Sequence, residues 1–289
     1  GPNPTPILLV HGFPDSFYRY HKVAPMLSDP AKFGGDPNLS FDVIVPSIPG
    51  TGFSGRRKVG IDATTDLFHK LMTEVLGYSK FISSGGDNGA YVTHSMAIRH
   101  PESLIGIHLT DVGYPDQTTD FSVLTPPEME MAQWVQQWFM AEGAGVNILQ
   151  ATKPQTLGYG LNDSPVGLAS WIASYSSSGL HGKEEFSGRF PHDEVLTNIM
   201  IYWVTETINS TVRAYYLAAQ DAPAFAERPT VPAAVAHCPY DPPLPRAWAE
   251  RRVNLVHFSD LERGGHFAAW EEPELYARDL QSFVKVLHQ

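Results

Sequence analysis

Short apolar segments, each ending in a turn of small or polar residues, constrain the fold of this chain more than any other feature. Six such segments lie at residues 7–10, 41–45, 81–84, 104–109, 231–236 and 253–258. Strand-like segments that alternate with helical patterns predict a parallel sheet joined by crossover helices. In such sheets the loops at the carboxyl ends of the strands form the binding site. We therefore expect an α/β fold, mostly parallel and flanked by helices, with its site at that edge.

The middle of the chain has a different pattern. Residues 115–229 show aromatic-rich helical segments and no clear strand, and these segments lie at 128–140, 166–175 and 195–217. This pattern predicts a helical cap inserted into the sheet domain. The core would then have a first part, residues 1–114, and a second part, residues 230–289. A last helix at 274–287 would pack on the sheet through apolar residues at helical spacing.

The stretch GGDNGA, residues 85–90, lies between a strand-like segment and a helical one. Small residues around one reactive side chain at such a junction are typical of a nucleophile elbow. The residue at its centre is Asp87, a carboxylate where serine or cysteine is more usual. The glycines would let this residue adopt a strained backbone conformation. A plain Asp-Gly turn is the alternative interpretation.

A histidine and an acid can be sought downstream of this elbow. His266 follows two glycines and a predicted strand near the end of the chain, which makes it a candidate base. An acid is expected between the cap and this histidine, since the chain order is then nucleophile, acid, histidine. Asp241 follows the segment at 231–236 and is the best candidate, with Asp260 and Glu262 as rivals. A Pro-Asp turn is the alternative for Asp241.

The first strand-like segment leads into HGFP, residues 11–14. A turn there can direct the backbone N–H of Phe13 into the site. Together with the N–H of Asn88 it would form a two-donor oxyanion hole. The Phe13–Pro14 bond is a candidate cis peptide, and His11 is expected to brace the loop.

Composition excludes several classes of function. The formal net charge of −11 and the pI of about 5.5 argue against nucleic acid and anionic membrane as partners. The single cysteine, Cys238, permits no internal disulfide and fits a reducing compartment, so a cytoplasmic location is expected. No apolar segment approaches the roughly 20 residues of a membrane span, so no anchor is expected in this chain. A homodimer is compatible with the sequence.

Several motifs together resemble the epoxide hydrolases of the α/β-hydrolase superfamily, and among them the microsomal-type branch, as a soluble, bacterial-like member. The matching stretches are HGFP, PSIPGTGFSG, GGDNGA, ATKPQTLGYGLNDSPVGLASWI, TNIMIYW and ERGGHFAAWEEPEL. The resemblance implies an α/β-hydrolase fold with an inserted helical cap. Relatives of that branch carry a long segment before HGxP, whereas ten residues precede His11 here. A shortened chain of this kind is expected to expose a sheet edge.

The resemblance also implies a reaction, in which an epoxide and water give a vicinal diol without cofactor or metal. Asp87 would open the ring as nucleophile and form an alkyl–enzyme ester, which water can hydrolyse. His266 would activate that water, and Asp241 would orient His266. Two cap tyrosines of the family donate to the epoxide oxygen, and Tyr215 matches one of them. A small hydrophobic epoxide is therefore the expected substrate, with a role in detoxification or secondary metabolism.

The sequence departs from the family at two positions of the site. The other tyrosine would fall at Val146, so Asn147 or Tyr159 is a candidate second donor. Asn88 stands where relatives often carry tryptophan, which in the related haloalkane dehalogenases helps to bind halide. We expect Trp134, Trp138 and Pro14 to line the substrate pocket.

Other functions stay open at this point. A hydrolase-fold protein that has lost turnover could use the cap cavity to hold a hydrophobic ligand. Haloalkane dehalogenase or esterase activity is the less favoured alternative. Turnover of an aryl epoxide distinguishes these from an epoxide hydrolase.

Overall fold

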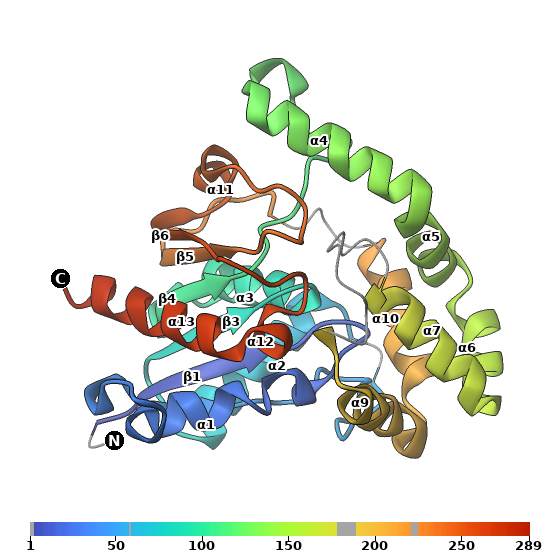
Figure 1. The fold of residues 1–289 in the computed structure, drawn as a ribbon, viewed down its shortest axis with the longest axis horizontal. Helices are drawn as coiled ribbons and strands as arrows, with labels where there is room; N and C mark the ends of the chain where they lie inside the picture. The colour runs from blue at the N-terminus through green and yellow to red at the C-terminus, as the bar shows by residue number, and fades with distance from the viewer. Residues whose placement is uncertain (1–2, 58, 178–188, 221–224) are drawn as a thin grey trace.

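The computed structural model describes residues 3–57, 59–177, 189–220 and 225–289. Its centre is a six-stranded sheet in the order β2-β1-β3-β4-β5-β6, and each neighbouring pair is parallel (Figure 1). The strands are β1 (Thr5–Val10), β2 (Phe41–Ile44), β3 (Phe81–Gly85), β4 (Leu104–Leu109), β5 (Pro232–His237) and β6 (Asn254–Asp260). The predicted parallel sheet is thus confirmed, and all six strands begin and end within two residues of the predicted segments.

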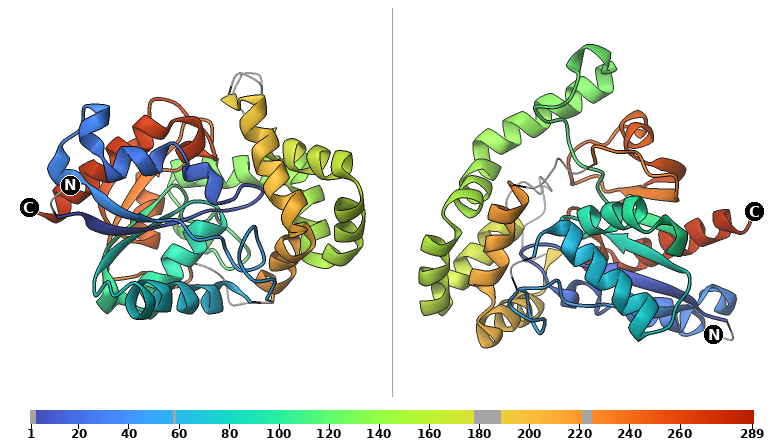
Figure 2. Two further views of the ribbon diagram at one scale, coloured as in Figure 1. Left: turned by 90° about the horizontal axis from the view of Figure 1, so that it is seen from below. Right: turned by 180° about the vertical axis from the view of Figure 1, so that it is seen from behind.

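Helices cover both faces of the sheet. Figure 2 shows α2 (Ile61–Lys70) and α3 (Asn88–Arg99) on one face, whereas α1 (Val23–Ser28) and α13 (Pro273–Leu287) lie on the other. The short helix α11 (Arg246–Arg252) packs with α3 into one apolar cluster. Because both faces are covered, the central strands β1, β3 and β4 are almost entirely buried, as near-continuous apolar strands require.

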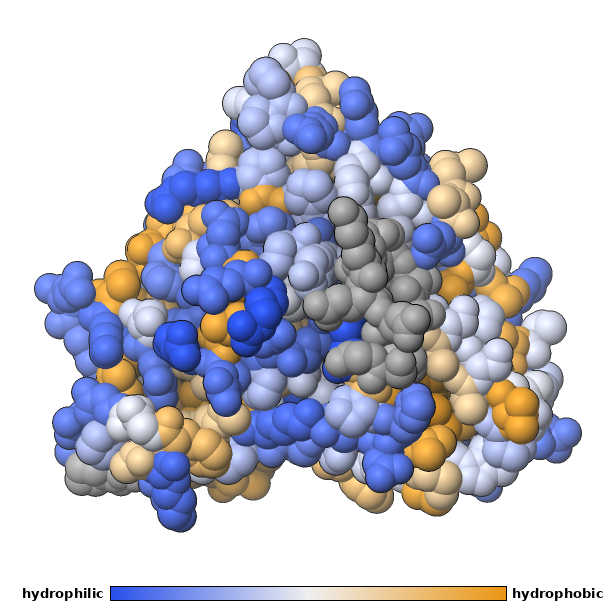
Figure 3. Space-filling model, viewed as in Figure 1, coloured by the Kyte–Doolittle hydropathy of each residue, from blue (hydrophilic) through white to orange (hydrophobic). Residues whose placement is uncertain are grey.

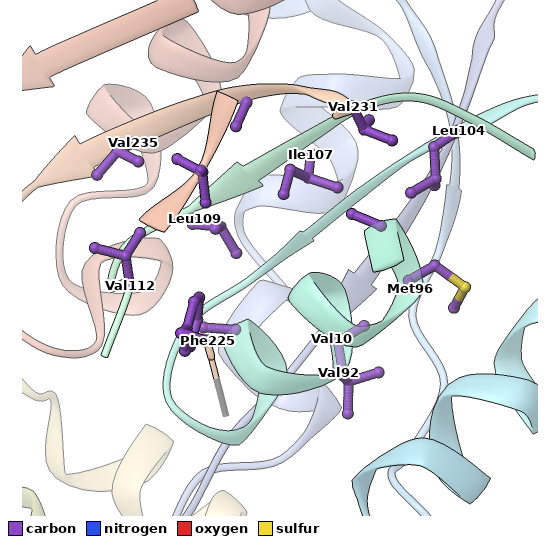
Figure 4. Packing of buried hydrophobic residues seen from close by; sticks show 14 of the residues in the cluster. Val10, Val92, Met96, Leu104, Ile107, Leu109, Val112, Phe225, Val231 and Val235 are labelled. Atoms are coloured by element: carbon purple, nitrogen blue, oxygen red, sulfur yellow. The ribbon is translucent and has the colours of Figure 1, made fainter. Parts of the chain in front are cut away.

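Two apolar clusters form the core, one on each face. The first joins β3 and β4 to α3, and Figure 4 draws part of it, including Val92 and Met96 of α3 and Ile107 and Leu109 of β4. The second lies under α1 and α13 and includes Leu280 of α13. Because all the strands are parallel, their carboxyl ends, including those of β1, β3 and β5, lie at one edge of the sheet.

Helices also make up the region that follows β4. They are α4 (Pro126–Trp138), α5 (Ala144–Thr152), α6 (Pro154–Asp163), α7 (Pro165–Ser177), α9 (His192–Thr205) and α10 (Ile208–Ala218). Within the described part of residues 115–229 there is no strand. Figure 1 shows these helices beyond one end of the sheet, opposite the two chain ends. The division into core and cap at residues 114 and 229 stays a prediction.

The predicted helical segment at 195–217 is two helices, so that prediction was too coarse. The chain turns at Glu206, whose φ of 51° is left-handed and ends α9. Thr207 then leads into α10. The apolar pattern alone could not locate this break, because both helices bury apolar residues in the same cluster.

The face of the molecule in Figure 3 shows hydrophilic side chains with hydrophobic ones scattered among them. Among the residues that the structure describes, no helix combines the length and the apolar character that crossing a bilayer requires.

Candidate active site

Asp87 occupies a sharp turn between β3 and α3. Its backbone has φ 53° and ψ −131°, a strained conformation that the surrounding structure must hold in place. A Cβ atom at Gly89 would lie 2.0 Å from the carbonyl oxygen of Val10, so only glycine fits there. The predicted elbow is therefore present. α3 begins at Asn88, and its first N–H is adjacent to the Asp87 carboxylate.

One oxygen of Asp87 receives two backbone N–H groups. Phe13 donates to Oδ1 over 2.8 Å and Asn88 donates to the same oxygen over 2.6 Å. These are the two N–H groups proposed from the sequence for an oxyanion hole. The Phe13–Pro14 bond is cis, as predicted.

His266 lies between two carboxylates. Its Nε2 is 3.2 Å from Oδ2 of Asp87, and its Nδ1 is 3.2 and 3.3 Å from the two oxygens of Asp241. Asp260, a rival acid, instead pairs with His237 over 2.8 Å and is 74% exposed, and Glu262 is also exposed. The structure thus brings together the three side chains that the sequence singled out.

Asp87 and His266 shift each other's pKa. Burial by itself would lower the pKa of His266, but Asp241 and Asp87 outweigh it and raise that pKa well above its usual value. Burial would also raise the pKa of Asp87, yet His266 and the two N–H groups hold it below its ordinary value. Both shifts favour the pair of a protonated His266 and an ionised Asp87 in the resting protein.

A cavity of about 270 Å³ opens above Asp87. Its lining comes from the strand ends and from α4, α5 and α10 of the helical region. Apart from Asp87, Asp241 and His266, it consists of Asn88, Tyr91, Asp111, Tyr114, Trp134, Val135, Trp138, Phe139, Asn147, Tyr215, Pro242 and Phe267. Most of these side chains are aromatic or aliphatic, with few polar groups, as in many small-molecule sites.

Some predicted residues are at this cavity and others are not. Trp134, Trp138, Asn147 and Tyr215 line it. Tyr159 does not, and the prediction that it is a second donor is wrong: its side chain is 65% exposed and its hydroxyl accepts from Gln155 over 2.7 Å.

The cause of this error is the packing of α6. That helix contacts α10 through the face with Gly158 and Leu161, which turns position 159 outward. Pro14 is buried beside α9 rather than at the cavity, and its carbonyl accepts from Asn198 over 2.8 Å. Its prediction as a pocket residue is also wrong.

Sequence reasoning missed Asp111 as a residue of the site. Its Oδ2 accepts the N–H of Asp87 over 2.9 Å, and its Oδ1 accepts the N–H of Gly113 over 3.1 Å. Burial raises its pKa to about 6. The available signal was its position two residues after the end of β4, at the carboxyl edge of the sheet.

Away from the cavity, His69, His100 and Glu102 form the cluster of possible metal ligands found among the described residues. The two imidazoles are stacked in parallel, with centroids 3.8 Å apart and planes 4° apart. Nitrogen lone pairs lie in the ring plane, so two stacked rings cannot direct them at one ion. The cluster as arranged is therefore a poor metal site.

Comparisons with known proteins agree with this geometry. The family described as alpha/beta hydrolase fold matches residues 5–273. Epoxide hydrolase 1 of Oryctolagus cuniculus is 35% identical, over 100% of this chain and 70% of its own length. A Stigmatella aurantiaca protein whose name places it among epoxide hydrolases is 37% identical over 99% of this chain, which covers 65% of that protein. The chain thus spans about two thirds of the length of these relatives.

Solved structures give the same result. Juvenile hormone epoxide hydrolase of the silkworm Bombyx mori superposes with a TM-score of 0.87 at 28% identity, over 99% of this chain and 73% of that one. Aspergillus niger epoxide hydrolase gives 0.81 at 27% identity, over 98% of this chain and 72% of that one. The chain belongs to the epoxide hydrolases of the alpha/beta hydrolase fold family.

Proposed function

We propose that this protein hydrolyses an apolar epoxide to a vicinal diol through an ester on Asp87. The observation that carries this proposal is that the two oxygens of that carboxylate have different hydrogen-bond partners. Oδ1 is held by two N–H groups, whereas Oδ2 faces His266, and the Asp87 side chain lines the cavity. Oδ2 would attack an epoxide carbon from behind and break its bond to the ring oxygen. Oδ1 would become the carbonyl oxygen of the resulting ester.

Tyr215 supports the first step. It lines the cavity from α10, and its ring packs edge-on against Phe13 with centroids 5.6 Å apart. A phenol is a suitable weak acid for the oxygen of an opening epoxide. Asn147 also lines the cavity, but one of its amide N–H groups already donates to the Gly143 carbonyl over 2.9 Å. We assign Tyr215 as the main donor and Asn147 as the candidate second one.

The second step needs His266 as a base, which its raised pKa would oppose in the resting protein. Ester formation removes the negative charge of Asp87, one of the two carboxylates that hold the proton on His266. The pKa of His266 then falls, because only Asp241 still stabilises the cation. His266 then releases its proton to solvent, which balances the proton that Tyr215 later takes back. The site thus becomes basic only after the ester has formed.

Neutral His266 takes a proton from water, and the hydroxide attacks the ester carbon. Phe13 and Asn88 would stabilise the oxyanion on Oδ1. The bond between the ester carbon and the alkyl oxygen breaks, the diol leaves with the proton from His266, and Asp87 keeps the oxygen of water. Tyr215 regains its proton from solvent. The aromatic lining of the cavity favours a bulky aryl or alkyl epoxide.

Styrene oxide tests this proposal. The wild-type protein is expected to give the diol, and Asp87→Asn to give none. His266→Gln should accumulate an adduct on Asp87, seen as a mass increase equal to one substrate, because loss of a general base slows hydrolysis by roughly 10²- to 10⁴-fold.

Two outcomes contradict the proposal. If wild type forms no diol with a range of bulky epoxides, the protein is better described as a ligand-binding relative. If diol forms but His266→Gln leaves no adduct, the ester mechanism is wrong. The homodimer and the cytoplasmic location stay predictions.

A further inference from the structure

A buried ion pair lies beneath the proposed site without lining its cavity. Arg19, in the short 3-10 helix η1 (Phe17–Tyr20), places its Nη1 2.8 Å from Oδ2 of Asp15. Both side chains are 1% exposed. Burying two charges is expensive, and an apolar pair of the same size is often as stable or more so. A requirement other than stability would explain why the charges are present.

The acidic partner holds the loop that supplies the oxyanion N–H. Oδ1 of Asp15 accepts the backbone N–H of Gly12 over 2.8 Å. The next residue, Phe13, donates to Asp87. The loop at Gly12 packs closely against Asp87, since a Cβ atom at Gly12 would lie 2.5 Å from Cβ of Asp87. A small shift of Gly12 would therefore move the Phe13 N–H relative to Asp87.

The basic partner holds the loop that carries the base. Nη2 of Arg19 donates to the backbone carbonyl of His266 over 3.2 Å. Its guanidinium also lies 5.7 Å from the ring centroid of Phe267. The ion pair thus spans two loops that lie far apart in sequence, one with an oxyanion N–H and the other with the imidazole.

The loop that contains Gly12, Phe13 and Asp15 is also attached to helix α9. Asn198 donates to the carbonyl of Pro14, and Ser16 donates to Asn198 over 2.8 Å. The hydroxyl of Tyr202 donates to the backbone carbonyl of Asp15. Both α9 and Arg19 therefore hold this loop in place.

We propose that the Asp15–Arg19 pair is a positioning unit that sets the distance between the Phe13 N–H and His266. This inference rests on the proposed epoxide hydrolase mechanism. Both groups act mainly in hydrolysis of the ester, whereas ring opening uses Oδ2 of Asp87 and the cap donor. Loss of the pair should therefore slow ester hydrolysis far more than ester formation.

The test separates the two steps by rapid quench and intact mass measurement with styrene oxide. In Arg19→Met and Asp15→Asn, the rate of ester decay is expected to fall roughly 10- to 100-fold, because small displacements of catalytic groups cost about this much. The rate of ester formation should change less than about 3-fold, so ester accumulates in the steady state. The double variant should lose no more than Arg19→Met alone, since the two residues act as one unit.

Arg19→Lys provides a milder change that keeps a charge opposite Asp15 but loses the planar fork which also reaches His266. It should give an intermediate rate of ester decay and keeps the test valid if the other variants do not fold. Glu128→Gln is the matched control: this buried carboxylate pairs with Arg251 over 2.6 Å and does not line the cavity. It should change neither step.

Equal slowing of both steps in Arg19→Met and Arg19→Lys would overturn the inference, as would ester accumulation in Glu128→Gln. A normal rate of ester decay in these two Arg19 variants would do the same. These results are distinct from failure of the proposed function, in which wild type itself forms no ester and no diol.

Discussion

Asp111→Asn is the substitution whose effect can be worked out most fully from the structure. The side chain is 5% exposed and accepts the N–H groups of Asp87 and Gly113. Burial raises its pKa from 3.8 to about 6, so the folded protein holds this proton more tightly than the unfolded chain. Ionised Asp111 therefore destabilises the folded protein. Asparagine does not titrate, so Asp111→Asn removes this destabilisation.

The sign and the size of the pH effect on the free energy of unfolding follow from this pKa shift. An acid whose pKa is raised on folding contributes no cost while both states are protonated, and its cost grows as pH rises toward the folded pKa. A shift from 3.8 to about 6 costs about 3 kcal/mol when fully ionised. Between about pH 4 and about pH 7, wild type should therefore lose about 2 kcal/mol that Asp111→Asn does not lose.

The measurement is the free energy of unfolding of both proteins by urea, across that pH range. Asparagine cannot accept both N–H groups, which destabilises the variant by about 1–3 kcal/mol at every pH. As pH rises, the free energy of unfolding of the variant should nevertheless increase relative to that of wild type. A difference that is constant with pH, or that moves in favour of wild type, would refute this reasoning.

Three further predictions concern the site. Tyr215→Phe should slow ester formation by roughly 10²-fold or more, with ester decay unchanged, in the same rapid-quench assay; equal slowing of both steps would contradict its assignment as acid. Gly89→Ala should abolish activity and lower the melting temperature, because its Cβ atom would lie 2.0 Å from the Val10 carbonyl oxygen; wild-type activity would show that the elbow is not needed. Trp138→Ala should raise KM for styrene oxide more than it lowers kcat, since this side chain lines the cavity but is not one of the proposed reacting groups; an unchanged KM would place the substrate elsewhere.

The sheet was predictable because its pattern is local. Each strand is a short apolar segment, and each turn that follows contains glycine, proline or a small polar residue. Strand β4 matches its predicted bounds at 104–109. The break at Glu206 was not predictable, because a single left-handed residue changes the direction of the chain without interrupting the apolar pattern.

The candidate site was predictable only in part. Asp87 and His266 stand in motifs of small residues whose local geometry exposes a side chain. Asp111 stands in no such motif, and neither do Asp15 and Arg19. Their roles depend on contacts with residues distant in sequence, such as the 3.2 Å hydrogen bond from Arg19 to the carbonyl of His266. No spacing rule indicates these contacts.

The sequence by itself determined which reactive groups this protein can offer: a carboxylate at an elbow, a downstream acid and histidine, and a tyrosine from the helical region. Local backbone sterics and residue type are enough for that. Only the tertiary structure decided which oxygen of Asp87 faces the backbone N–H groups and which faces His266. It also decided that Tyr215 lies at the cavity while Tyr159 points outward. Sheet order and helix packing set these distances, because they bring together residues that lie 74 apart in the chain for Phe13 and Asp87 and 179 apart for Asp87 and His266.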